Sequence, residues 1–235
     1  MWDWSLFWKQ LLERDAIRAA EATISAAIVG QLIGVTLGIL LGAVGASRRR
    51  WPRRVVDAYV RVFRGTPLLL QILAFYIVPS EYGIQLPVFV AGALALGMNE
   101  AAYLSEVVRS GLMSVDRGQR EAAQVLGMSS AQVLLWVTLP QAARVMIPPM
   151  GNAFNAMLKT TSLLGFISYE ELLRHANLVL DTVYRPFEIF AVITVYYLAM
   201  TAAWGLVQSR LERYFRVGGS APVARRRPMP RLAEV

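Results

Sequence analysis

Long apolar runs separated by short polar segments are the main pattern of this chain. The segments 22–47 and 189–209 contain no charged residue, and each is long enough to cross a hydrocarbon layer roughly 30 Å thick as a helix. Shorter apolar runs begin at Pro67, Pro87 and Pro148. The pattern predicts an all-α, polytopic membrane protein with about five transmembrane helices. The predicted spans are residues 22–47, 67–79, 87–108, 148–167 and 186–209.

Glycine recurs at every fourth position of the first predicted span, at Gly30, Gly34, Gly38 and Gly42. Residues four apart lie on one face of a helix, so these glycines form a strip without side chains. Such a strip lets a second helix approach closely inside a membrane. We therefore expect this face to pack against another helix rather than against lipid.

Positive charge is concentrated just beyond the ends of the apolar runs. Arginines cluster at 48–54 and again from residue 210 onward, and they give the chain most of its net charge of +8. Cytoplasmic loops of membrane proteins carry such clusters, so we expect the N-terminus outside and the C-terminus in the cytoplasm. This distribution indicates membrane topology rather than a nucleic-acid-binding surface. Only 17% of the residues are charged, which is too few for the surface of a soluble domain of this size.

The remaining segments are expected to lie outside the bilayer core. Residues 1–21 mix tryptophan with charged residues and predict an amphipathic interfacial segment on the outer surface. Residues 55–63 have an amphipathic pattern that fits a segment lying along the membrane surface. Thr66 is then expected to cap a helix that starts at Pro67. Residues 80–86 and 168–185 are predicted to be outer loops, and residues 217–235 are predicted to be a disordered cytoplasmic tail. With no Cys and one His, neither a disulfide nor a metal site is expected.

The polar segment 109–144, between the third and fourth predicted spans, has a defined local pattern. Asp116 is a suitable N-cap for a short helix over 117–126, and Gly127 is a suitable left-handed residue after that helix. Ser129 and Gln132 are spaced as a capping box for a second short helix, which we expect to end at Pro140. On physical grounds alone, two interpretations stay open: a knob that docks on a partner, or a helix lying on the cytoplasmic leaflet.

Several motifs of the chain resemble those of the permease subunits of bacterial ABC importers for polar amino acids. The resemblance extends from about residue 22 to residue 211, in the order and spacing of the motifs. The matching positions are 64–69, 101–103, Glu106, Arg109, 118–119, 121–123, Gly127, 139–141, Pro149, Asn152, 159–163 and 171–172.

The resemblance implies the transmembrane domain of a type I ABC importer, spanning residues 22–216, in the bacterial cytoplasmic (inner) membrane. It implies two cytoplasmic ATPase subunits, a second permease chain and an extracytoplasmic amino-acid-binding protein as partners. The segment 109–144 then couples the permease to the ATPase. The coupling residues that the resemblance suggests are Gly118, Gln119, Glu121, Ala122, Ala123, Gly127 and Pro140. ATP and magnesium are expected on the partner subunits, because this chain contains no phosphate-binding loop and is not expected to be an enzyme.

Polar residues within the predicted spans are candidates for a substrate pathway, since burying them in lipid is costly. They are Asn99, Glu100, Tyr103, Glu106, Lys159, Thr160 and Thr161. The spacing puts Glu100, Tyr103 and Glu106 on one helix face, where carboxylates can bind a substrate ammonium. For Glu106 and Arg109 we favour a structural ion pair, whereas both interpretations stay open for Glu100. Lys159 is expected to order the pathway at an irregular turn.

Other functions remain as alternatives. A permease for a different small solute, such as a quaternary amine or an opine, fits the same motifs. A stand-alone ion-coupled carrier fits the apolar pattern, although we find no internal repeat of the kind that many such carriers have. A membrane-embedded enzyme is disfavoured, because no cluster of catalytic or metal-binding side chains is evident.

Overall fold

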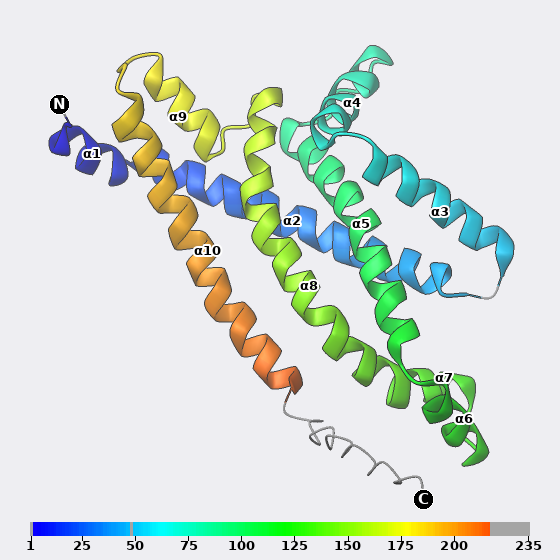
Figure 1. The fold of residues 1–235 in the computed structure, drawn as a ribbon. Coiled ribbons are helices and arrows are strands. Elements are labelled where there is room, and N and C mark those ends of the chain that lie inside the picture. The colour runs from blue at the N-terminus through cyan, green and yellow to red at the C-terminus, as the bar shows by residue number, and fades with distance from the viewer. Residues whose placement is uncertain (1, 48, 217–235) are drawn as a thin grey trace, which may run out of the picture.

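The computed structural model describes residues 2–47 and 49–216, and all of its regular structure is helical (Figure 1). The helices are α1 (Trp4–Leu11), α2 (Arg14–Gly45), α3 (Arg50–Gly65), α4 (Leu68–Glu81), α5 (Val88–Ser114), α6 (Arg117–Val125), α7 (Ser130–Gln132), α8 (Leu139–Thr160), α9 (Leu172–Leu180) and α10 (Pro186–Arg216). A π-helical segment, η1 (Val133–Thr138), precedes α8, and a 3₁₀ helix, η2 (Thr161–Ile167), follows it. The predicted tail 217–235 lies outside the described residues.

Three helices of the described part are long and apolar enough to cross a membrane: α2, α5 and α10. Helices α3 and α4 would form a fourth crossing if they count as one span, bent by 103°. Helix α8 does not meet this criterion, since it contains Arg144, Asn152, Asn155 and Lys159. The helical, multi-pass class is therefore confirmed.

The glycine strip of α2 is the main contact surface between the long helices. A Cβ added at Gly30 would lie 3.1 Å from the Leu96 Cβ, and one at Gly38 would lie 2.7 Å from the Leu104 Cβ. Gly34 and Gly42 face Glu100 and Val108 in the same way. Each step of four residues along α2 thus matches four residues along α5, so the two helices run parallel and in register. The predicted helix–helix contact is confirmed.

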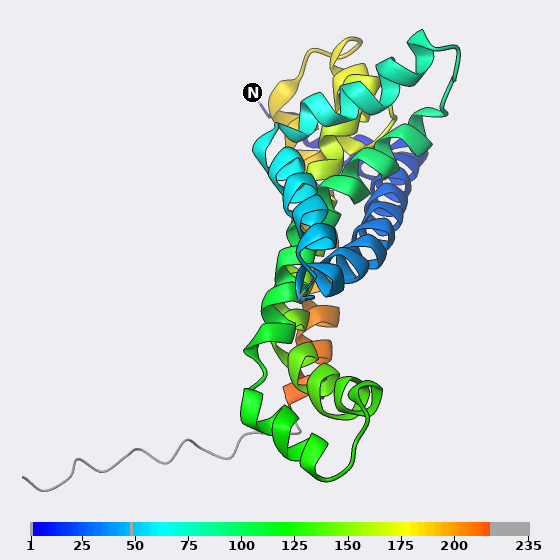
Figure 2. The same ribbon diagram turned by 90° about the vertical axis from the view of Figure 1, so that its right-hand side faces the viewer.

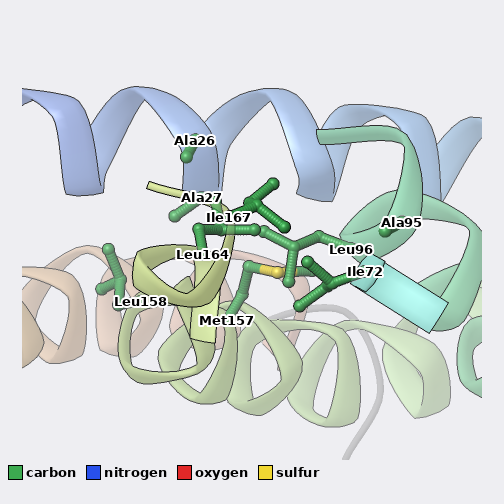
Figure 3. Close-up of a cluster of buried hydrophobic side chains, with 9 residues drawn as sticks. All are labelled: Ala26, Ala27, Ile72, Ala95, Leu96, Met157, Leu158, Leu164 and Ile167. Atoms are coloured by element: carbon green, nitrogen blue, oxygen red, sulfur yellow. The ribbon is translucent and has the colours of Figure 1, made fainter. Parts of the chain in front are cut away.

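A buried apolar cluster packs α4, α8 and η2 against this pair (Figure 3). Its α2 members are alanines, whereas α4, α5, α8 and η2 contribute larger side chains. Its members are Ala26, Ala27, Ile72, Ala95, Leu96, Met157, Leu158, Leu164 and Ile167. Helices α4 and α9 lie at one end of the molecule, and α6 and α7 lie at the other (Figures 1 and 2).

The break between α3 and α4 corrects the predicted start of the second span. Thr66 does not cap α4; its hydroxyl donates to the Val62 carbonyl of α3 at 2.8 Å, and Pro67 occupies the N-cap position. Because Pro67 has no N–H, it cannot donate to the Phe63 carbonyl as a continuing helix would. Side-chain amides replace that donor: Gln71 Nε2 lies 2.8 Å and Asn99 Nδ2 3.1 Å from the Phe63 oxygen.

Two predicted interruptions of the chain near α8 are also wrong. Pro140 was expected to end a short helix and Pro148 to start a span, but helical residues continue from Ser130 to Ile167. Pro140 is the second residue of α8, separated by one residue from the end of η1 at Thr138. A π-helical turn is wider than an α turn, so the carbonyls before the proline ring are displaced and the chain continues without a break. Pro148 and Pro149 lie inside α8.

The terminal boundaries differ from the predicted ones as well. The segment 1–21 is not one helix, because α1 ends at Leu11 and α2 already begins at Arg14. Helix α1 is attached to α10 instead: the Asp3 N–H donates to Glu188 at 2.9 Å, and the Tyr196 hydroxyl donates to the Leu11 carbonyl at 2.7 Å. At the other end, α10 continues past the predicted boundary at 209 to Arg216.

The predicted outer loop 168–185 contains a helix of its own, α9. Glu171 is fully buried and caps it, accepting hydrogen bonds from the backbone N–H groups of Leu173 (2.9 Å) and Arg174 (2.7 Å) and from the Tyr197 hydroxyl (3.1 Å). Burial raises the pKa of the Glu171 carboxyl, against the lowering effect of these bonds. Because Leu172 and Ala176 are buried against α2 and α10, the segment is part of the packed structure.

We expect Gly42→Ala to destabilise the protein. The added Cβ would lie 2.6 Å from the Val108 Cβ and 2.7 Å from the Ser105 carbonyl oxygen, so α2 and α5 must move apart. Overpacking of this kind costs about 1–3 kcal/mol, measurable as a lower thermal unfolding midpoint in detergent. Gly205→Ala is the control, since nothing lies within 4 Å of its added Cβ. Equal midpoints for both variants would contradict the close contact.

Candidate functional site

Residues 115–132, called the knob below, form a compact polar unit at one end of the bundle (Figure 2). The Asp116 carboxylate caps α6 by accepting from the N–H groups of Gly118 (2.7 Å) and Gln119 (3.3 Å). Gly127 has a φ of +84°, and the Met128 N–H donates to the Ala123 carbonyl at 3.1 Å to close the helix end. Ser129 and Gln132 form the reciprocal capping box. The predicted local structure of the knob is confirmed.

The exposed surface of the knob differs from the predicted coupling set. Gly118, Gln119, Glu121 and Ala122 are exposed, and Glu121 is paired with Arg117 at 2.6 Å. Ala123 is buried inside the knob, and Pro140 lies outside it, at the start of α8. The most prominent apolar residues are Val125 and Leu126, which are 87% and 83% exposed. Sequence reasoning missed this pair, although two adjacent apolar residues ending an otherwise polar helix were a usable signal.

One side chain joins the knob firmly to α5. The Arg120 guanidinium donates to the carbonyls of Leu112 (3.0 Å) and Val115 (2.7 Å), where α5 ends. These carbonyls have no partner within the helix ladder, so Arg120 both satisfies them and fixes the direction of α6. The role of Arg120 depends on a tertiary contact, and the sequence pattern gave no sign of it.

A cavity of about 390 Å³, called the α5 cavity below, lies between α4, α5 and α8. Asn99, Glu100, Tyr103 and Thr160 line it together with apolar residues such as Leu96. The Glu100 Oε1 atom is buried and has no hydrogen-bond partner among the described residues. A buried carboxylate oxygen without a donor is costly, so this atom is suited to bind a ligand that brings an N–H group.

The walls of the α5 cavity are connected to the α3–α4 bend. Asn99 donates to the Gln71 Oε1 at 3.0 Å as well as to the Phe63 carbonyl. The Tyr59 hydroxyl of α3 donates to the Met98 carbonyl of α5 at 2.6 Å. The guanidinium carbon of Arg64 lies 5.0 Å from the centre of the Tyr103 ring, a cation–π contact. The bend and the cavity wall therefore form one hydrogen-bonded unit.

The other predicted pathway residues lie elsewhere. Glu106 forms an ion pair with Arg109 at 2.7 Å, as predicted. Both residues belong to α5, so the pair does not connect two helices. Thr161 is buried and donates to the Leu158 carbonyl at 2.9 Å. Lys159 lines a different cavity, between α8, α9 and α10, and forms no ion pair with Glu100 in the described structure.

Comparisons with known proteins agree over most of the chain. The family described as binding-protein-dependent transport system inner membrane component matches residues 34–217. The glutamine transport system permease protein GlnP of Escherichia coli (strain K12) is 30% identical over 217 residues, covering 92% of this chain and 98% of that protein. The arginine transport system permease protein ArgU of Corynebacterium glutamicum is 31% identical over 237 residues, covering 95% of this chain and 75% of that protein.

Solved structures give the same result for the fold. The crystal structure of an amino acid ABC transporter with histidines superposes with a TM-score of 0.83 at 33% sequence identity, covering 91% of this chain and 99% of that one. An inward-facing structure of the MetNI methionine ABC transporter superposes with a TM-score of 0.69 at 18% identity and shares the fold.

We expect Gly127→Val to loosen the knob. A Val side chain disfavours the left-handed backbone at φ +84° by about 1–2 kcal/mol, which corresponds to a roughly 5- to 30-fold larger locally open population. Limited trypsin digestion at Arg117 and Arg120, quantified by mass spectrometry, measures that population. The control is Gly83→Val, which has a φ of +78° in the turn between α4 and α5. Faster cleavage of the knob in both variants, or in neither, would contradict the role of Gly127.

Proposed function

This chain belongs to the family of binding-protein-dependent transport system inner membrane components, and we propose that it imports a polar amino acid from an extracytoplasmic binding protein. It is the membrane-spanning permease subunit of an ABC importer for amino acids. The observation that carries the proposed mechanism is the position of α5, which lines the α5 cavity and ends at the knob. One continuous helix therefore connects a ligand-sized cavity to an exposed docking surface.

The proposed topology has five crossings in the bacterial inner membrane. Helices α2, α5 and α10 each cross once, and α3 and α4 together form one bent crossing. Helix α8 supplies the remaining crossing, and the rest of the complex shields its polar faces from lipid. The arginines at the start of α3 and those at the end of α10 support a cytoplasmic position for these helix ends. The N-terminus and α9 are then on the outer side.

The knob is the proposed contact with a cytoplasmic ATPase subunit. Val125 and Leu126 supply the apolar anchor, while Gly118, Gln119, Glu121 and Ala122 lie around it on the exposed surface. Ala123 and Gly127 shape the knob from inside, and Pro140 permits the continuous turn into α8. In this proposal two ATPase subunits bind ATP and magnesium, a second permease chain completes the complex, and the permease itself needs no cofactor. Closure of the ATPases moves the knobs, and α5 transmits that movement to the cavity.

The α5 cavity is the proposed path of the amino acid. The partnerless Glu100 oxygen accepts the substrate ammonium, while Tyr103 and Thr160 supply further hydrogen-bonding groups. A quaternary amine has no N–H to donate to Glu100, and the Tyr103 ring that would bind its charge already contacts Arg64. An amino acid therefore fits this cavity better than a quaternary amine does.

We expect Glu121→Lys to weaken binding of the ATPase subunit, because it reverses an exposed charge on the knob and breaks the pair with Arg117. The measurement is co-purification of the co-expressed ATPase subunit with the permease. Glu81→Lys is the matched control, since Glu81 is an exposed acid at the opposite end of the molecule. Undiminished co-purification and normal ATP-driven uptake with Glu121→Lys would refute the docking role.

We expect Glu100→Gln to impair uptake while ATPase binding is retained. Loss of a charge-assisted hydrogen bond weakens transition-state or substrate binding by about 1.5–3 kcal/mol, or roughly 10- to 150-fold in uptake efficiency. Uptake of a labelled amino acid into proteoliposomes, with the ATPase content determined in the same samples, separates the two effects. Unchanged uptake would remove Glu100 from the pathway.

A further inference from the structure

A second polar cavity lies on another face of α8, between α8, η2, α9 and α10. Its volume is about 520 Å³, within the range of small-molecule sites. Ala156 and Thr160 of α8 line the α5 cavity, whereas Asn155 and Lys159 line this one, called the α10 cavity below. The two cavities share no lining residue, so a ligand in one does not contact the walls of the other.

The α10 cavity contains two polar groups of opposite hydrogen-bonding character, the ammonium of the exposed Lys159 and a buried amide oxygen, and neither has a partner among the described residues. The Lys159 ammonium forms neither an ion pair nor a hydrogen bond with any described residue. The buried Asn155 Oδ1 atom has no donor among the described residues. The two residues are four apart on α8, so their side chains lie on adjacent turns of one face. The Lys159 ammonium can donate to an anionic acceptor, and the buried Asn155 oxygen needs a donor close beside it.

The walls of the α10 cavity contain both apolar and polar side chains, and this determines which ligand is complementary to it. Leu173 of α9 and Leu198 of α10 supply apolar surface, and Thr201 and Tyr197 of α10 also line the cavity. The Tyr197 hydroxyl already donates to the buried Glu171 carboxylate at 3.1 Å, which fixes that wall in place. A ligand that carries a carboxylate and an ammonium on one carbon, with a variable side chain, satisfies both free groups and contacts these walls.

We propose that the α10 cavity is a second amino-acid-binding site of this chain, in which Lys159 binds the α-carboxylate and Asn155 accepts from the α-ammonium. The choice of an amino acid rests on the proposed transport function, whereas the donor and acceptor requirements rest on Asn155 and Lys159 themselves. A ligand here connects α8 to α10, so its binding favours the helix arrangement in which both walls contact it.

The chain allows a site-specific test because it contains only two lysines, Lys9 and Lys159. The Lys9→Arg variant, assembled with its ATPase in nanodiscs, has a single side-chain amine in the permease. We would acetylate it with N-succinimidyl acetate and measure the rate at Lys159 by peptide mass spectrometry, with and without L-glutamine or L-arginine. Because the α-amine of the free amino acid also consumes the reagent, the rate at Lys159 is expressed relative to that of an exposed lysine of the ATPase subunit in the same sample. Saturating amino acid should slow acetylation at least tenfold. Asn155→Leu in the same background should abolish that protection.

Glu100→Gln in the same background is the control for an indirect effect from the α5 cavity. Protection that is lost with Glu100→Gln but retained with Asn155→Leu would overturn the proposal. So would unchanged acetylation in an importer that transports the same amino acid, a result that leaves the proposed function intact. Absence of transport of either amino acid, with Lys159 still protected, would instead refute their import and retain the site.

Two further outcomes identify a different occupant. If Lys159 is unreactive before any amino acid is added, and becomes reactive in nanodiscs that lack phosphatidylethanolamine, a lipid headgroup fills the cavity and the proposal is wrong. If it is unreactive in every lipid, the second permease chain covers it, and the proposal is wrong in that case too. Should Asn155→Leu fail to fold, bound L-[³H]glutamine per permease chain provides the test: Lys159→Met should lower it from two to one.

Discussion

The close parallel contact of α2 with α5 is the constraint on which the rest of the structure depends. In a bilayer, apolar side chains gain little by leaving lipid, so helices associate where small residues let their backbones approach. The strip from Gly30 to Gly42 provides that surface, and every fourth residue of α5 from Leu96 to Val108 fits onto it. Leu96 and Glu100 belong to this contact and also line the α5 cavity, so the register fixes part of the cavity wall.

The break between α3 and α4 is stabilised by side chains, and one of them, Asn99, also lines the α5 cavity. The Phe63 carbonyl loses its backbone donor at Pro67 and receives the amides of Gln71 and Asn99 instead. In an apolar surrounding an unpaired carbonyl would be costly. The same bonds that permit a 103° bend therefore also hold Asn99 at the cavity wall.

Local patterns predicted local structure well, and tertiary contacts account for most of what they missed. The Asp116 cap, the Gly127 helix end and the glycine strip each depend on residues within a few positions of one another. By contrast, the π-helical passage before Pro140 and the burial of Ala123 depend on neighbours that spacing does not reveal. Glu100 and Lys159 illustrate the same limit, since both were expected along one pathway yet line different cavities.

The bond of Arg120 to the end of α5 has a mechanical consequence. Two helical segments leave the knob, and they differ in stiffness. Helix α5 contains no proline from Val88 to Ser114, whereas the run into α8 contains a π-helical segment and three prolines. In the proposed coupling mechanism, a movement of the knob is therefore transmitted along α5, while α8 bends to accommodate it.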